Sequence, residues 1–145
     1  MNNFTTVFTR GNHIESTHDI KVLISNIKGR DLLSSGHNED YIYPRSSIKV
    51  FQAIPFIESN AINYFKLNSK NIALSCSSHR GENFHIKELK TWLKKINIRM
   101  KDIKCGIHNP LNKSANESLL RSKNSPNELY NNCAGKHLGM ISSCI

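Results

Sequence analysis

The sequence predicts an α+β fold (a mixed α/β class) in which an antiparallel sheet packs with helices. Most strand-like segments lie in the first third of the chain, and helical spacing of apolar residues begins after Pro44. The chain has 145 residues, a length that fits one domain. Hydrophobic residues make up 38% of it and are spread throughout, so the composition favours a packed core over disorder.

Short, β-branched or alternating segments predict the strands. Phe4 to Thr9 is apolar and stops at a glycine, and Ile20 to Ile27 alternates before the turn signal Lys28-Gly29. Asp31 to Ser35 is the next candidate strand. Together these segments predict an antiparallel hairpin or meander.

Apolar residues at helical spacing predict two main helices. From Ser46 to Ser59 they recur every three or four residues, although Pro55 should kink or break that helix. His85 to Ile96 carries one apolar stripe with lysines largely off it, and Asn83 is the expected N-cap. This pattern indicates a core helix and not a basic recognition helix.

The remaining segments are less regular. Ala73 to Cys76 is expected to be a short buried segment, and its polar continuation would sit at a strand end. Asn109 to Leu129 is rich in Asn and Ser and predicts a long connection with one helical turn near Leu119. A last helix should begin after Gly135 and run from Lys136 to Ile145.

The net charge of +9 comes from lysines that are scattered along the chain. A nucleic-acid site would cluster them on one element with interleaved aromatic residues, so we expect no nucleic-acid partner. No run of residues approaches the length of a membrane span, and the first residues lack a secretory pattern. Four widely spaced cysteines without a CxxC pair then favour reduced thiols and a cytoplasmic location.

Ser46 and Lys49 form a Ser-x-x-Lys motif at the start of a predicted helix. Residues i and i+3 share one helix face, so the two side chains lie together. A serine hydroxyl is a weak nucleophile until a neighbouring unprotonated amine takes its proton, as in β-lactamases and penicillin-binding proteins. Ser25 and Lys28 match the same pattern at a strand end, where no function is expected. Ser47 is a second hydroxyl, but its phase relative to Lys49 is wrong.

Two further segments carry chemistry-bearing residues. In the first, Ser77, Ser78 and His79 follow an apolar run, an arrangement that suits a proton relay or a plain serine-rich turn. In the second, Cys133 follows two asparagines and opens the last helix. Cys133 and His137 alone do not make a zinc site, and the alternative for Cys133 is a small buried residue.

Taken in order, four stretches resemble the asparaginase II family of the serine, β-lactamase-like type. They are YPRSSIKVFQAIPFIES, ALSCSSHRGENFH, CGIHNPLN and ELYNNCAGKHLGM. Each stretch alone is moderately specific. Four of them in the right order and spacing are highly specific, because the probabilities of separate chance matches multiply. The resemblance implies a β-lactamase-like or penicillin-binding-protein-like fold and hydrolysis of L-asparagine to L-aspartate and ammonia through an acyl-serine.

The resemblance also implies roles for individual residues. Ser46 is similar to the family's nucleophile, Lys49 to its base and Ser78 to the second hydroxyl that relays a proton. Arg45 and His79 would line the pocket and orient the substrate. In addition, Cys133 and Lys136 resemble the first two ligands of a zinc site near the substrate, where lysine must be neutral to bind.

The family pattern extends beyond this chain. By this resemblance we expect residues 1–145 to correspond to the N-terminal portion of a single asparaginase II domain whose C-terminal half is absent. That half would supply another zinc-ligating cysteine, an acidic residue that grips the substrate and a second lysine. We therefore expect the truncated chain to be inactive alone, although a homodimer is possible in the full-length family. The alternatives are a non-catalytic gene remnant and a small basic nucleic-acid-binding module.

Overall fold

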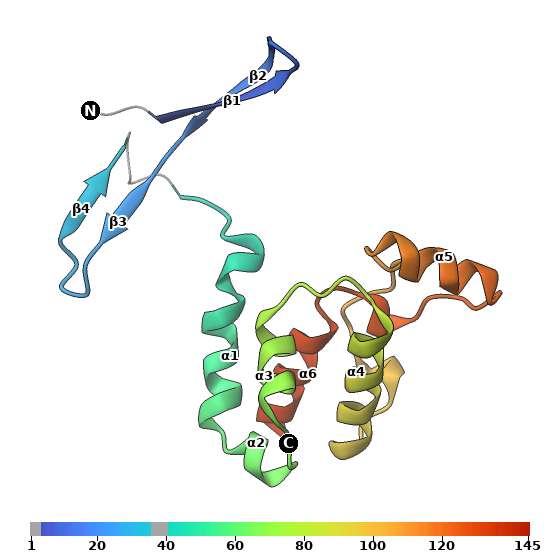
Figure 1. The fold of residues 1–145 in the computed structure, drawn as a ribbon. Helices are drawn as coiled ribbons and strands as arrows, with labels where there is room; N and C mark the ends of the chain where they lie inside the picture. The colour runs from blue at the N-terminus through green and yellow to red at the C-terminus, as the bar shows by residue number, and fades with distance from the viewer. Residues whose placement is uncertain (1–3, 36–40) are drawn as a thin grey trace. The chain divides into compact units, whose positions relative to one another are not determined.

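The computed structural model describes residues 4–35 and 41–145, and it is a mixed α/β structure of small antiparallel sheets and α-helices (Figure 1). The chain divides into two compact units, Met1–Tyr43 and Pro44–Ile145. The described strands lie in the first unit and the helices in the second, as the sequence predicts. No helix in these described ranges is long and apolar enough to cross a bilayer.

The first unit contains two separate hairpins in its described part, where the sequence predicts one sheet. Strands β1 (Phe4–Arg10) and β2 (His13–Ile20) pair antiparallel, and so do β3 (Leu23–Ser25) and β4 (Asp31–Ser34). Ser35 explains why the predicted strand from Ile20 to Ile27 is interrupted. Its buried hydroxyl accepts a hydrogen bond from Val22 N (2.8 Å) and donates one to Ile20 O (3.2 Å), which takes these backbone groups out of a continuous ladder.

The second unit is helical. Its elements are η1 (Arg45–Ile48), α1 (Lys49–Glu58), α2 (Ala61–Tyr64), α3 (Ser69–Cys76), α4 (Asn83–Lys95), η2 (Met100–Asp102), α5 (Lys113–Arg121), η3 (Glu128–Tyr130) and α6 (Ala134–Cys144). The predicted helices after Pro44, around Leu89 and at the end of the chain are confirmed.

Four local predictions are wrong. Pro55 lies inside α1 and does not break it, since the helix continues to Glu58 and buries Ala53 and Phe56 near the proline. Asn83 is the first residue of α4, and Glu82 takes the cap position. The connection after Asn109 holds α5, a helix of nine residues where a single turn was expected, and Asn112 caps it by accepting a hydrogen bond from Ala115 N.

The fourth correction concerns Ala73 to Cys76, which forms the end of helix α3 and not a segment leading into a strand end. The helix starts earlier because Asn68 and Asn71 form a reciprocal capping box. The polar residues Ser77, Ser78 and His79 therefore follow a helix.

Helices α1, α3, α4 and α6 enclose the core of the second unit (Figure 1). The predicted stripe of α4 is buried, and Trp92 beside it is fully enclosed (0% exposed). The centroid of its indole ring lies 5.3 Å from the centroid of the Phe56 ring, and the indole Nε1 donates a hydrogen bond to Ser142 Oγ at 3.1 Å. This bond satisfies the polar group of a large core aromatic residue and fixes α4 against α6.

Gly135 allows α6 to approach α3 more closely than any other residue could. A Cβ atom at this position would lie 2.3 Å from the carbonyl oxygen of Leu74. One turn later, a Cβ at Gly139 would lie 3.1 Å from the Cβ of Ser75. Because the clash at Gly135 is with backbone, it can be relieved only by moving a helix.

We expect Gly135→Ala to destabilise the chain by about 2 kcal/mol or more, because an inserted methyl group must separate two packed helices. Gly139→Ala is the matched control on the same helix. Its contact is a side chain, and its gain in helix propensity offsets part of the strain. Urea denaturation followed by circular dichroism measures both variants, and equal stabilities would contradict the close-approach argument.

Candidate active site

A continuous chain of hydrogen bonds joins the beginning of α1 to the end of α3. Lys49 Nζ donates to Ser78 Oγ at 2.7 Å, and Ser78 Oγ donates to Ser46 Oγ at 3.1 Å. Lys49 Nζ also donates to the carbonyl oxygen of Ser77 at 2.9 Å. Three residues named from the sequence are thus brought together, with Ser78 between the other two.

The local backbone explains why Ser46 and Lys49 face the same way. Ser46 lies in η1, a 3₁₀ turn in which residues i and i+3 eclipse, and Lys49 is the first residue of α1. Arg45, just before Ser46, has a φ of 48°, which is uncommon for a residue with a side chain. A non-glycine residue in this region indicates that the turn presenting Ser46 is imposed by its surroundings.

Lys49 is buried, whereas Ser46 and Ser78 are exposed. Only 2% of Lys49 is accessible, and no ion pair in the described ranges involves it. Burying an ammonium group without a carboxylate is costly. The polar contacts of this amine are instead a carbonyl oxygen and a hydroxyl group. The site therefore pairs an accessible hydroxyl with an enclosed amine.

The loop after α3, which carries Ser78, is fixed by contacts at Arg80, Gly81 and Glu82. Gly81 has a φ of 80°, and a Cβ there would lie 3.0 Å from Pro110 Cβ, so both its conformation and its space call for glycine. Arg80 O accepts from Asn112 N at 2.9 Å. Asn112 Nδ2 in turn donates to Glu82 Oε1 at 3.1 Å. The loop is thus fixed to the segment that leads into α5.

Two histidines, His79 and His85, pack against each other at this loop. His79 is 3% exposed, and its Nδ1 accepts from Gly81 N at 3.2 Å. Its ring lies 5.2 Å from that of His85, whose Nδ1 approaches Glu82 Oε2 at 2.9 Å without hydrogen-bond alignment. Burial first, then the proximity of His85 and Lys49, lowers the pKa of His79 from 6.5 to about 4. His79 is therefore neutral at physiological pH.

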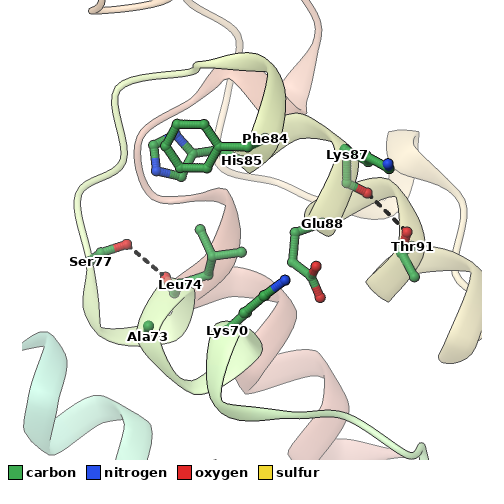
Figure 2. Close-up of a pocket in the computed structure, with 9 residues that line it drawn as sticks. All are labelled: Lys70, Ala73, Leu74, Ser77, Phe84, His85, Lys87, Glu88 and Thr91. Atoms are coloured by element: carbon green, nitrogen blue, oxygen red, sulfur yellow. Dashed lines mark hydrogen bonds between the residues drawn. The ribbon is translucent and has the colours of Figure 1, made fainter.

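A cavity of about 610 Å³ lies between α3 and α4. Figure 2 shows Phe84 and His85 at one end of it and Lys70 and Glu88 at the other, with Leu74 in between. Ser77 also lines it, but Ser46, Lys49 and Ser78 do not. The cavity therefore adjoins the hydrogen-bonded chain without containing it.

The residues compared with zinc ligands lie at the start of α6. Cys133 caps this helix and Lys136 is its third residue, so the two lie on one face. Cys105 is near both, and burial first of all raises the pKa of its thiol. Within the described ranges no group of three or more His, Cys, Asp or Glu side chains is placed to hold a metal ion. Cys133 and Lys136 by themselves do not complete a four-ligand zinc site.

Two hydroxyl groups and a buried amine in one hydrogen-bonded series are the groups that nucleophilic catalysis by a serine would require. The sequence matches the family model of L-asparaginase II over residues 6–145, and the chain belongs to this family. A search of curated proteins gave no match.

Several contributors to the site were not found from the sequence. The carbonyl of Ser77, the carboxylate of Glu82 and the side chain of Asn112 all support the loop. All three lie within the stretches that resemble the asparaginase II family, but nothing in the sequence predicts these contacts. The Gly81 signal was present, since a glycine one residue past Arg80 in a polar turn indicates a left-handed conformation. Its contact with Pro110 could not be deduced without the fold.

The lowered pKa of His79 predicts a loss of stability in acid. Between about pH 6.5 and pH 4 the unfolded chain binds a proton at this position that the folded chain excludes, so the free energy of unfolding falls as the pH falls. The total effect is about 3 kcal/mol. Urea denaturation of the native chain and of His79→Asn across this range tests the expectation. The variant should lose less stability, and parallel curves would show that His79 does not contribute.

Proposed function

We propose that the chain carries the nucleophilic centre of an L-asparagine amidohydrolase of the serine, β-lactamase-like type. The observation that carries the proposal is the series Ser46 Oγ, Ser78 Oγ and Lys49 Nζ, with separations of 3.1 and 2.7 Å. Membership of the L-asparaginase II family supports asparagine as the substrate. The position of the serine at a helix start, with lysine three residues later, supports the β-lactamase-like type.

In the proposed reaction Ser46 attacks the side-chain carboxamide carbon of L-asparagine. Hydroxyl groups both donate and accept, so the hydrogen-bond series can reverse: Ser46 passes its proton to Ser78, and Ser78 passes its own to Lys49. A neutral amine can donate to Ser77 O while its lone pair accepts a proton from Ser78. The hydrogen bond from Lys49 Nζ to Ser77 O is therefore compatible with Lys49 acting as the base.

Collapse of the tetrahedral adduct breaks the carbon–nitrogen bond. The proton held by Lys49 returns through Ser78 to the leaving nitrogen, which departs as ammonia and leaves an ester on Ser46. Water then attacks the ester, releases L-aspartate and restores the Ser46 hydroxyl. The exposed guanidinium of Arg45, next to the nucleophile, is suited to pair with the α-carboxylate of the substrate.

Zinc is a second part of the proposal. Cys133 and Lys136 would supply two of its ligands, with the remainder coming from outside the described residues. Zinc supplies a Lewis acid and an anchor for polar substrate groups when it is bound. The four cysteines are free thiols, which suits metal binding and a reducing compartment such as the cytoplasm.

Reactivity of Ser46 is the first test of the mechanism. We expect a fluorophosphonate probe to label the native chain at Ser46, and Ser46→Ala to abolish labelling. Lys49→Met should slow labelling by about a thousandfold because the base is removed. Peptide mapping by mass spectrometry locates the adduct, and release of ammonia from L-asparagine is measured in parallel.

Ser47→Ala is the matched control, since Ser47 lies next to the nucleophile but donates only to Pro44 O. The Ser47→Ala variant should be labelled at Ser46 at the same rate as the native chain. Labelling of Ser47 or equal labelling of Ser46→Ala would overturn the nucleophile assignment. Labelled Ser46 without release of ammonia would support the chemistry but assign the isolated chain to an inactive form. An unlabelled but folded chain would favour the non-catalytic remnant.

The incomplete donor set predicts weak zinc binding. We expect the isolated chain, dialysed against micromolar zinc, to retain well under one equivalent, because two protein ligands do not make a closed site. Atomic absorption measures the retained metal, and Cys133→Ser serves as the comparison. Stoichiometric retention that disappears in Cys133→Ser would contradict this expectation and place the missing ligands within the chain.

A further inference from the structure

His79 makes one hydrogen bond in the described structure, and that bond is internal to the loop carrying Ser78. Its Nδ1 accepts from Gly81 N at 3.2 Å, so the neutral ring carries its proton on Nε2. The Nε2 atom is enclosed and has no hydrogen-bond partner among the described residues. The ring is therefore connected to its surroundings through Nδ1 and through packing.

The Nδ1 bond closes a short turn that begins immediately after Ser78. Gly81 at the other end of the turn is pressed against Pro110, with a hypothetical Cβ 3.0 Å away. Lys49 fixes the near end of the loop through Ser77 O. Ser78 thus lies between two anchored points, and the imidazole of His79 closes the second.

We propose that His79 is a positioning residue that acts through Nδ1 to hold Ser78 Oγ between Ser46 and Lys49, and that it does not contact the substrate. The proposal rests on the proposed function, because it assigns Ser78 to the proton relay. It also replaces the expectation that His79 orients the substrate directly.

The surroundings of the ring favour this role. Burial first of all disfavours a positive charge on His79, and so do His85 from α4, Lys49 from α1 and His108 from the segment before α5, whereas Glu82 favours one. A protonated ring would lose the Nδ1 acceptor and release Gly81 N. The neutral form, which burial and these neighbours favour, is the form that can hold the turn.

Two amide side chains separate the roles of the two ring nitrogens. In His79→Asn the side-chain oxygen can occupy the place of Nδ1, whereas in His79→Gln the amide reaches the place of Nε2. His79→Leu fills the space and provides neither group. The measured quantity is the rate at which the fluorophosphonate probe labels Ser46 in the full chain.

We expect His79→Leu and His79→Gln to slow labelling by about tenfold to a hundredfold, the usual effect of a small displacement of a reacting group. His79→Asn should stay within about threefold of the native rate, because one acceptor is retained. Rescue by Gln and not by Asn would assign the function to Nε2 and overturn the proposal. Native rates in all three variants would overturn it as well.

Hydrogen exchange of the Gly81 amide provides a readout that needs no reactive serine. His79→Leu should speed this exchange about fivefold or more, and His79→Asn should not. If the native chain is not labelled at Ser46, the proposed function has failed. Unchanged Gly81 exchange in His79→Leu, with or without labelling, would overturn the positioning role itself.

Discussion

The amine of Lys49 is removed from water where helix α1 meets the end of α3, and the site depends on this one burial. Its hydrogen bonds to Ser77 O and Ser78 Oγ join Lys49 to residues that lie 28 and 29 positions further along the chain. An enclosed amine needs such partners because leaving it unpaired is costly. The same bonds place Ser78 beside Ser46, so the group that anchors the loop is also the proposed base.

The core supplies the rigidity that this arrangement needs. Gly135 lets α6 contact the backbone of Leu74, three residues before Ser77, and Trp92 fixes α4 to α6 through Ser142. A shift of α3 would therefore displace the carbonyl that Lys49 uses. In the proposed mechanism stability and reactivity are therefore coupled, because the groups assigned to the reaction lie at helix ends and helix ends move when the helices repack.

The sequence could identify part of the site, for a physical reason. Ser46 and Lys49 are one helical turn apart, so local periodicity alone places them together. Ser78 lies 32 residues from Ser46, and no local rule brings them into contact. Its polar turn suits a proton relay or a plain serine-rich turn, and resemblance to the asparaginase II family is what favours the relay. Its secondary-structure context was predicted wrongly because Asn68 starts α3 earlier than the apolar run suggests.

By itself the sequence determined that strands come first and helices follow Pro44, that the stripe of α4 is buried, and to which family the chain belongs. These properties follow from short-range periodicity and from ordered motifs. Only the tertiary structure decided that the first unit forms separate hairpins, that Pro55 remains inside a helix and that His79 bonds to its own loop. Each of these features depends on which polar and apolar groups are buried. Burial is decided by contacts between segments that are distant in the chain.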